Sequence, residues 1–165
     1  MKEIKTIIFT ILMMLVTGCE KDITTDTPKQ SEEQDIPSVI DEEQKEHALT
    51  VAEAIEAEED SYICVKGYLV AATQRSIKNA DFEKPFSGSS AIVLADKKVE
   101  ENTEYYLNEL FPVCLTDCSK SIRNALNLVD NPDNHNHLIY IYGIREKYMS
   151  MPGMKKVTDF EIIIK

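Results

Sequence analysis

The sequence predicts a mainly β fold, a five-stranded barrel with one short helix before the first strand and a second helix between the third and fourth strands. Five segments are rich in β-branched and aromatic residues and are separated by turn-forming stretches, whereas two segments repeat apolar residues at helical spacing. The chain has 165 residues, enough for one domain and too few for two comfortable ones.

The first two elements are a helix at residues 51–57 and a strand at residues 61–73. Thr50 and Glu53 form a capping box at the start of the helix, just ahead of a short apolar stripe. Gly67 lies in the middle of the strand, where a glycine permits the bend that a small barrel needs.

Four more strands are expected after the first. The second is expected at residues 89–96, after a long polar loop at 74–89, and the third at 111–116. The fourth and fifth, at 137–149 and 155–165, are expected to meet at a Pro-Gly turn.

The second helix is predicted at residues 119–128, where Ser119 or Ser121 can cap it. It falls between the third and fourth of five strands. That order is typical of an OB-fold, a partly open five-stranded Greek-key barrel, whereas an immunoglobulin-like sandwich would need about seven strands.

The N-terminus predicts a lipid anchor. Residues 7–16 form an apolar run that is too short for a transmembrane helix and suits a signal peptide, here residues 1–18. Residues 15–18, Leu-Val-Thr-Gly, resemble a bacterial lipobox ahead of Cys19, which we expect to be acylated. The acylated chain would begin Cys-Glu-Lys-Asp, residues 19–22. This acidic start resembles the surface-export signal of Bacteroidota lipoproteins, which implies the outer membrane and an outward-facing protein.

Charge divides the rest of the chain into a tether, residues 19–47, and a domain, residues 48–165. Residues 20–47 hold three basic and ten acidic residues, a net charge of −7, and no aromatic residue, so the tether is predicted to be disordered. The domain holds 13 basic and 18 acidic residues, a net charge of −5. A domain that is not broadly basic does not suit tight, non-specific binding to duplex nucleic acid.

Three cysteines remain after lipidation, so at most one internal disulfide can form. Cys114 could pair with Cys118 or with Cys64, or the thiols could stay free as small buried apolar groups.

Catalytic motifs are missing from the sequence. His135 and His137 lie two residues apart, but four metal ligands are not visible, and no nucleophile elbow, phosphate-binding glycine loop or paired carboxylates occur. We therefore expect no enzymatic activity, no metal and no cofactor.

A ligand-binding rim is predicted at two loops, residues 74–89 and 145–156, because OB barrels bind oligonucleotides and oligosaccharides between their first and last hairpin loops. The loops carry net charges of +1 and +3 within an acidic domain. The candidate binding residues are Arg75, Lys78, Arg145, Lys147, Lys155 and Lys156, with Phe82, Phe86 and Tyr148 as stacking surfaces. Alternatively, the lysines only keep the hairpin ends soluble, and both phenylalanines fold back over the barrel mouth.

Several segments resemble an OB-like domain of unknown function that occurs in Bacteroidota lipoproteins and near the N-terminus of secreted sugar-non-specific endonucleases. They are TVAEAI, VKGYLV, IVLAD, RNALNLVDNPDN and YGIREKYMSMPGMKKVTDFE, and the resemblance covers most of residues 49–161. It implies the fold, but it does not imply nuclease activity, because the catalytic domain of those enzymes is absent from this chain.

Two functions are therefore expected from the sequence. The first is a lipid-anchored binding module for single-stranded nucleic acid or a glycan. The second is an interaction subunit that docks another envelope protein through its sheet edge or its loops.

Overall fold

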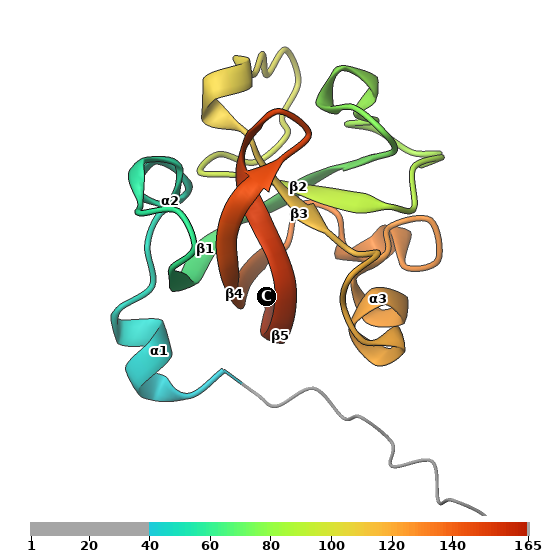
Figure 1. The fold of residues 1–165 in the computed structure, drawn as a ribbon. Coiled ribbons are helices and arrows are strands. Elements are labelled where there is room, and N and C mark those ends of the chain that lie inside the picture. The colour runs from blue at the N-terminus through green and yellow to red at the C-terminus, as the bar shows by residue number, and fades with distance from the viewer. Residues whose placement is uncertain (1–39, 165) are drawn as a thin grey trace, which may run out of the picture. The chain divides into compact units, whose positions relative to one another are not determined.

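The computed structural model describes residues 40–164, which form a closed barrel in the strand order β1-β2-β3-β5-β4 (Figure 1). The strands are β1 (Tyr62–Thr73), β2 (Ala91–Ala95), β3 (Phe111–Cys114), β4 (Leu138–Tyr148) and β5 (Met151–Ile163). The helices are α1 (Glu42–Glu46), α2 (Val51–Glu56) and α3 (Lys120–Leu126), with single 3-10 turns η1 (Ile77–Asn79), η2 (Leu107–Glu109) and η3 (Pro132–Asn134). The predicted five-stranded OB-like barrel with a helix between its third and fourth strands is confirmed.

Closure of the barrel depends on β3 and β5. Four neighbouring strand pairs are antiparallel, and β3 with β5 is the parallel pair, in register at Val113 and Met154. Inside the barrel lies one apolar cluster. Its largest fully buried members are Phe111, Leu69, Ile92, Leu94, Leu115, Leu126, Leu128, Ile139, Ile141 and Met154. Burying each such side chain stabilises the fold by about 1.5–3 kcal/mol before conformational entropy is counted.

Helix α2 begins as predicted. The Thr50 side chain accepts from the Glu53 N–H, and the Glu53 carboxylate accepts from the Thr50 N–H at 2.8 Å. The Asp96 carboxylate, just after β2, accepts from the N–H groups of Val51 and Ala52 at 2.8 and 3.0 Å. The helix is therefore held to the end of β2.

Gly67 makes room for this helix. A Cβ at Gly67 would lie 2.8 Å from Cγ2 of Val51 on α2. The irregularity of β1 falls three residues later, between Leu69 and Ala71, where the register with β2 shifts. The glycine therefore allows close packing of α2 on β1. Its role in bending the strand stays a prediction.

The β4–β5 hairpin turns at Met149 and Ser150, not at the predicted Pro-Gly pair. These two residues have φ of 51° and 68°, as two-residue hairpin turns require. Pro152 and Gly153 lie inside β5, which starts earlier than predicted. A Cβ at Gly153 would lie 2.5 Å from the Pro112 carbonyl oxygen, so glycine allows the approach of β5 to β3.

Helix α3 is capped by Ser119, whose hydroxyl accepts from the Ile122 N–H at 3.3 Å. It ends at Leu126, two residues before the predicted end. The Asn131 side-chain amide donates to the carbonyl oxygens of Asn124 and Asn127 at 2.6 and 3.1 Å. The last carbonyls of the helix are thus satisfied without another helical turn.

The segment from Ile40 to His47, which the sequence assigned to the tether, packs on the barrel and contains α1. Ile40 is 2% exposed, and Nζ of Lys45 lies 2.7 Å from Oε2 of Glu161 on β5. One apolar side chain and one ion pair thus hold a segment whose composition looked disordered. The signal peptide, Cys19 and the tether up to residue 39 lie outside the described residues.

Candidate functional site

The expected ligand face of the barrel, the outer side of β2, is covered by the chain's own loops. Val93 and Ala95 point to this side, yet they are only 0 and 1% exposed. Both belong to a second apolar cluster. Its buried members are Val70, Ala71, Ile77, Val93, Ala95 and Leu110, and packed against them are Tyr68, Ala80, Phe82, Val99, Tyr105 and Met151. The face over which OB barrels bind ligands is therefore filled by residues of the β1–β2 loop and the β2–β3 connection.

Hydrogen bonds hold the β2–β3 connection in place. The Asn136 side chain accepts from the Val99 N–H and donates to the Val99 carbonyl, both at 2.8 Å. The Tyr105 hydroxyl donates to the Lys97 carbonyl at 2.9 Å. Burial raises the pKa of Tyr105 to about 12, and the carboxylates of Glu100 and Glu109 add to this shift.

The β1–β2 loop is held in a similar way. Asp81 and Ala72 exchange backbone hydrogen bonds of 2.8 and 3.1 Å, and the Asp81 carboxylate accepts from the hydroxyl and N–H of Ser87. These hydrogen bonds from Ser87 lower the pKa of Asp81. The loop is thus ordered over the outer face of β2 and does not form an open ligand-binding rim.

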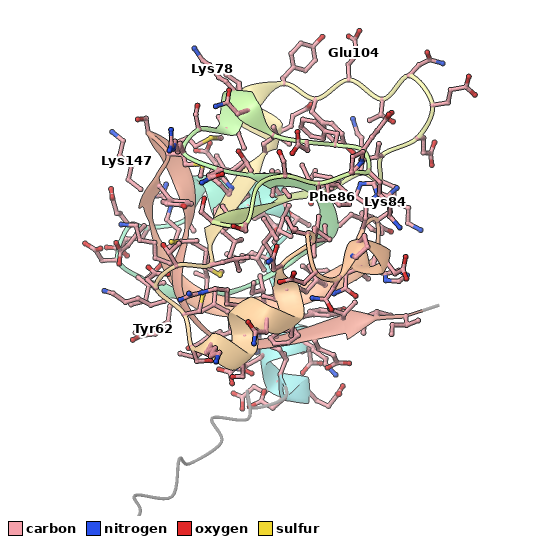
Figure 2. All side chains as sticks on the ribbon, turned by 90° about the vertical axis from the view of Figure 1, so that its right-hand side faces the viewer. Tyr62, Lys78, Lys84, Phe86, Glu104 and Lys147 are labelled. Carbon is pink, nitrogen blue, oxygen red and sulfur yellow. The ribbon has the colours of Figure 1, made fainter. Side chains whose placement is uncertain are left out.

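The aromatic candidates do not form a free stacking surface. The Phe82 ring stacks on Tyr105, with centroids 5.3 Å apart and planes 13° from parallel. Phe86 is only 8% exposed and packs against His135 in the core, so the expectation that it stacks on a ligand is corrected (Figure 2). Tyr148 is half-buried, and burial raises its pKa.

Four of the basic residues in the two predicted loops are engaged within the chain. The Glu146 carboxylate binds Lys155 at 2.8 Å and Lys156 at 3.2 Å, and these contacts lower the pKa of Glu146. Lys84 pairs with Asp133 at 2.9 Å. The Arg145 guanidinium donates to the carbonyl of Ile55 at 2.9 Å, and its Nη1 lies 3.9 Å from Glu59.

The remaining three candidates, Arg75, Lys78 and Lys147, are exposed and make no ion pair within residues 40–164. Figure 2 shows Lys78 and Lys147 towards one end of the molecule, well separated from Lys84. Of the six basic candidates, three are thus engaged within the chain and three have no ion pair among the described residues.

The two predicted loops flank an apolar groove of about 560 Å³. It lies between η1 of the first loop, the β4–β5 turn and η2 of the β2–β3 connection. Its lining is mainly aliphatic and thioether. The residues are Ile55, Ser76, Ile77, Lys78, Leu107, Asn108, Leu110, Met149, Ser150, Met151 and Pro152. Leu107, one of these lining residues, is 51% exposed, so the groove presents apolar surface to solvent.

Of the residues that line this groove, only Lys78 is among the binding residues predicted from the sequence. The lining comes from four segments that are distant in sequence, so no local spacing could identify it. One usable signal was present: Met149 and Met151 lie in and directly after a hairpin turn, where solubility would favour polar residues.

The cysteines and histidines form no metal centre in the described part of the chain. Residues 40–164 contain no group of three or more His, Cys, Asp or Glu side chains that could hold a metal ion. Cys64, Cys114 and Cys118 are all free thiols in the structure. The His135 Nε2 lies 3.0 Å from the Val70 carbonyl oxygen.

None of the helices between residues 40 and 164 is long and apolar enough to cross a membrane.

The fold and the groove define a small OB-like barrel whose usual ligand face is covered and whose loop end is apolar. The chain belongs to the family described as a domain of unknown function, DUF6359, whose model matches residues 49–163. Among solved structures, the fold is similar to that of the hypothetical protein ygiW from E. coli. That likeness has a TM-score of 0.40 and 11% identity, over 70% of this chain and 89% of the other. No curated protein matches the sequence significantly.

Proposed function

We propose that this protein is a lipid-anchored envelope module that docks another envelope protein in the groove between η1, η2 and the β4–β5 turn. The observation that carries the proposal is the apolar lining of that groove, with Leu107 half exposed beside it. Exposed apolar grooves rimmed by polar residues are typical of interaction sites.

The groove suits a polypeptide better than an oligonucleotide or an oligosaccharide. Nucleic acid needs phosphate contacts and stacking faces, but Lys155 and Lys156 are bound to Glu146, and Phe82 is stacked within the chain. A polypeptide segment with aliphatic side chains would bury the lining, and Lys78 at the groove favours a carboxylate on that segment.

We assign no catalytic step to the groove. Its side chains are aliphatic, thioether, hydroxyl and amide groups with a single amine, a set that offers no general base beside a nucleophile. The role proposed is positioning of a partner at the envelope, where acylated Cys19 would hold the protein at the outer membrane.

Site-specific photocrosslinking in cells tests this function. A photoreactive residue is placed at Leu107 or Ser150 in the groove, and at Val129 as a control, because Val129 is 42% exposed after α3 and does not line the groove. We expect one adduct of the same mass from both groove positions and none from Val129. Equal adducts from Val129, or none from the groove, would contradict the docking function.

Variants of the groove can then show how much apolar contact and charge each contribute to retention of the captured partner. Leu107→Glu should weaken retention of the partner at least about tenfold, because it puts a charge into a desolvated contact, whereas Val129→Glu should not. Lys78→Glu should weaken it as well if the partner segment is acidic. The same variants are tested on short oligonucleotides at low salt. Wild-type binding that falls steeply with salt would instead favour the nucleic-acid function.

A further inference from the structure

A second pocket lies on the outer face of β1 and β4, away from the groove. Residues alternate along β1, so Tyr62 and Cys64 face outward while Ile63 joins the core. The Tyr62 ring stacks on Tyr142, with centroids 5.8 Å apart and planes 22° from parallel, yet Tyr62 remains 60% exposed. Figure 2 shows Tyr62 and Lys78 towards different ends of the molecule, so the two sites are separate.

Helix α1 and the residues beside it form the other wall of this pocket. Ile40 is buried beneath the segment, and Lys45 binds both Glu161 at 2.7 Å and Glu42 at 2.9 Å. The helix is thereby fixed on the sheet. The pocket has a volume of about 380 Å³ and is open to solvent, with Asp41, Glu43, Gln44 and His47 on one side and Tyr62 and Tyr142 on the other.

The pocket is negatively charged. Two carboxylates line it, from Asp41 and Glu43, and no lysine or arginine does. The neighbouring Lys45 is already bound to two carboxylates of its own. Within residues 40–164, no group donates a hydrogen bond to the Glu43 carboxylate, so this charge has no internal partner.

A buried carboxylate lies beside the pocket. Strand pairing places Tyr142 between Cys64 and Asp159, so these three residues form a row across the outer face. Asp159 is only 8% exposed, and its Oδ1 has no hydrogen-bond partner among the described residues. Burial raises the pKa of Cys64 to about 11, and the carboxylates of Asp41 and Asp159 add to this shift. Both negative charges therefore act at the pocket wall.

The same face already holds a cation on an aromatic ring. The Lys66 ammonium lies 5.6 Å from the centroid of the Tyr140 ring. Ring faces attract cations most strongly when the cation is partly desolvated, and carboxylates strengthen the attraction. Aromatic faces and negative charge in one open pocket thus both favour binding of a cation.

We propose that this pocket binds the alkylammonium group of a small organic cation. The exposed face of Tyr62 would contact the cation, and the Glu43 carboxylate would neutralise it. An anionic ligand would meet two carboxylates, and the pocket lining contains no lysine or arginine that would pair with a phosphate.

Ligand-detected NMR and calorimetry on the detergent-solubilised full-length protein test the site. The probes are choline and propylamine, each compared with a neutral counterpart of similar shape, 3,3-dimethyl-1-butanol and propanol. We expect at least one cation to bind more tightly than its neutral counterpart. Tyr62→Ala should weaken that binding by about five- to thirtyfold, whereas Tyr62→Phe, which keeps the ring, should retain it.

Two further variants complete the test. Glu43→Gln, which keeps the shape and removes the charge, should weaken binding of the cation and leave that of the neutral compound unchanged. Tyr106→Ala removes another exposed tyrosine, 68% exposed just before η2 and outside this pocket, and should have no effect. The proposal is overturned if neither cation binds better than its neutral counterpart, or if Tyr62→Ala and Tyr106→Ala behave alike.

Discussion

The ring of Phe82 stacks on the ring of Tyr105, with 5.3 Å between centroids, and this contact joins the β1–β2 loop to the β2–β3 connection. Both rings pack against the apolar cluster that covers Val93 and Ala95 of β2. A side chain that the sequence marked as a ligand contact thus binds the chain itself. Its position explains why the outer face of β2 is unavailable to a ligand.

The Phe82–Tyr105 contact predicts measurable coupling. In a double-mutant cycle with Phe82→Ala and Tyr105→Ala, we expect a coupling free energy of about 0.5–1.5 kcal/mol, typical of stacked aromatic pairs. Urea unfolding of the four proteins provides the measurement. If the two single-variant losses in free energy of unfolding add strictly, the rings stabilise the two loops independently.

Phe86 should behave as a core residue. Phe86→Ala is expected to lower the free energy of unfolding by about 3–5 kcal/mol, because it leaves a cavity beside His135. The matched control is Tyr106→Ala on the surface, with an expected change below about 0.5 kcal/mol. A Phe86→Ala protein with unchanged urea midpoint would contradict the placement of this ring.

Glu146 should make stability depend on pH. Its contacts with Lys155 and Lys156 lower its folded-state pKa, so its contribution is present above the unfolded pKa of about 4.3 and is lost as the pH falls through the folded pKa. Glu146→Gln should therefore lower the melting temperature at pH 7, and the difference from wild type should shrink below about pH 4.

Two observations accompany the Glu146 test. Glu56→Gln is the matched control, since Glu56 is exposed and makes no ion pair in the described part of the chain. Glu146→Gln also leaves Lys155 and Lys156 without their carboxylate, so any weak affinity for oligonucleotides should increase in this variant. A pH-independent difference in melting temperature would argue against the ion pairs as the cause.

The packing of α1 predicts where proteolysis stops. Limited digestion should remove residues before Ile40 and leave Ile40 to His47 protected, because Ile40 is buried and Lys45 binds Glu161. Ile40→Asp should extend cleavage to about Ala48, which intact-mass measurement would detect. Early cleavage within residues 41–47 of the wild type would contradict the packed helix.

The lipid anchor remains a prediction from the sequence. Cys19→Ala should abolish acylation and release the protein from the membrane fraction, because at least two acyl chains are needed for stable anchoring. Labelling with a fatty-acid analogue should mark the wild type alone. Equal labelling of both proteins would show that Cys19 is not the acceptor.

The sequence by itself determined the barrel, because the signals for it are local. The Thr50–Glu53 capping box, the serine at the start of α3 and the five β-rich segments each act within a few residues, and their order allows one familiar topology. The turn at Met149 and Ser150 was missed, because Pro-Gly is a strong turn signal, whereas here Gly153 serves the approach of β5 to Pro112 on another strand.

Only the tertiary structure decided which side chains are available. Lys155 and Lys156 are bound by Glu146 across the hairpin, and Phe82 is stacked on a residue 23 positions later. The groove and the tyrosine pocket also draw their walls from segments that are distant in sequence. Charge and apolar character can be read along a chain, but exposure depends on which partners folding brings within contact distance.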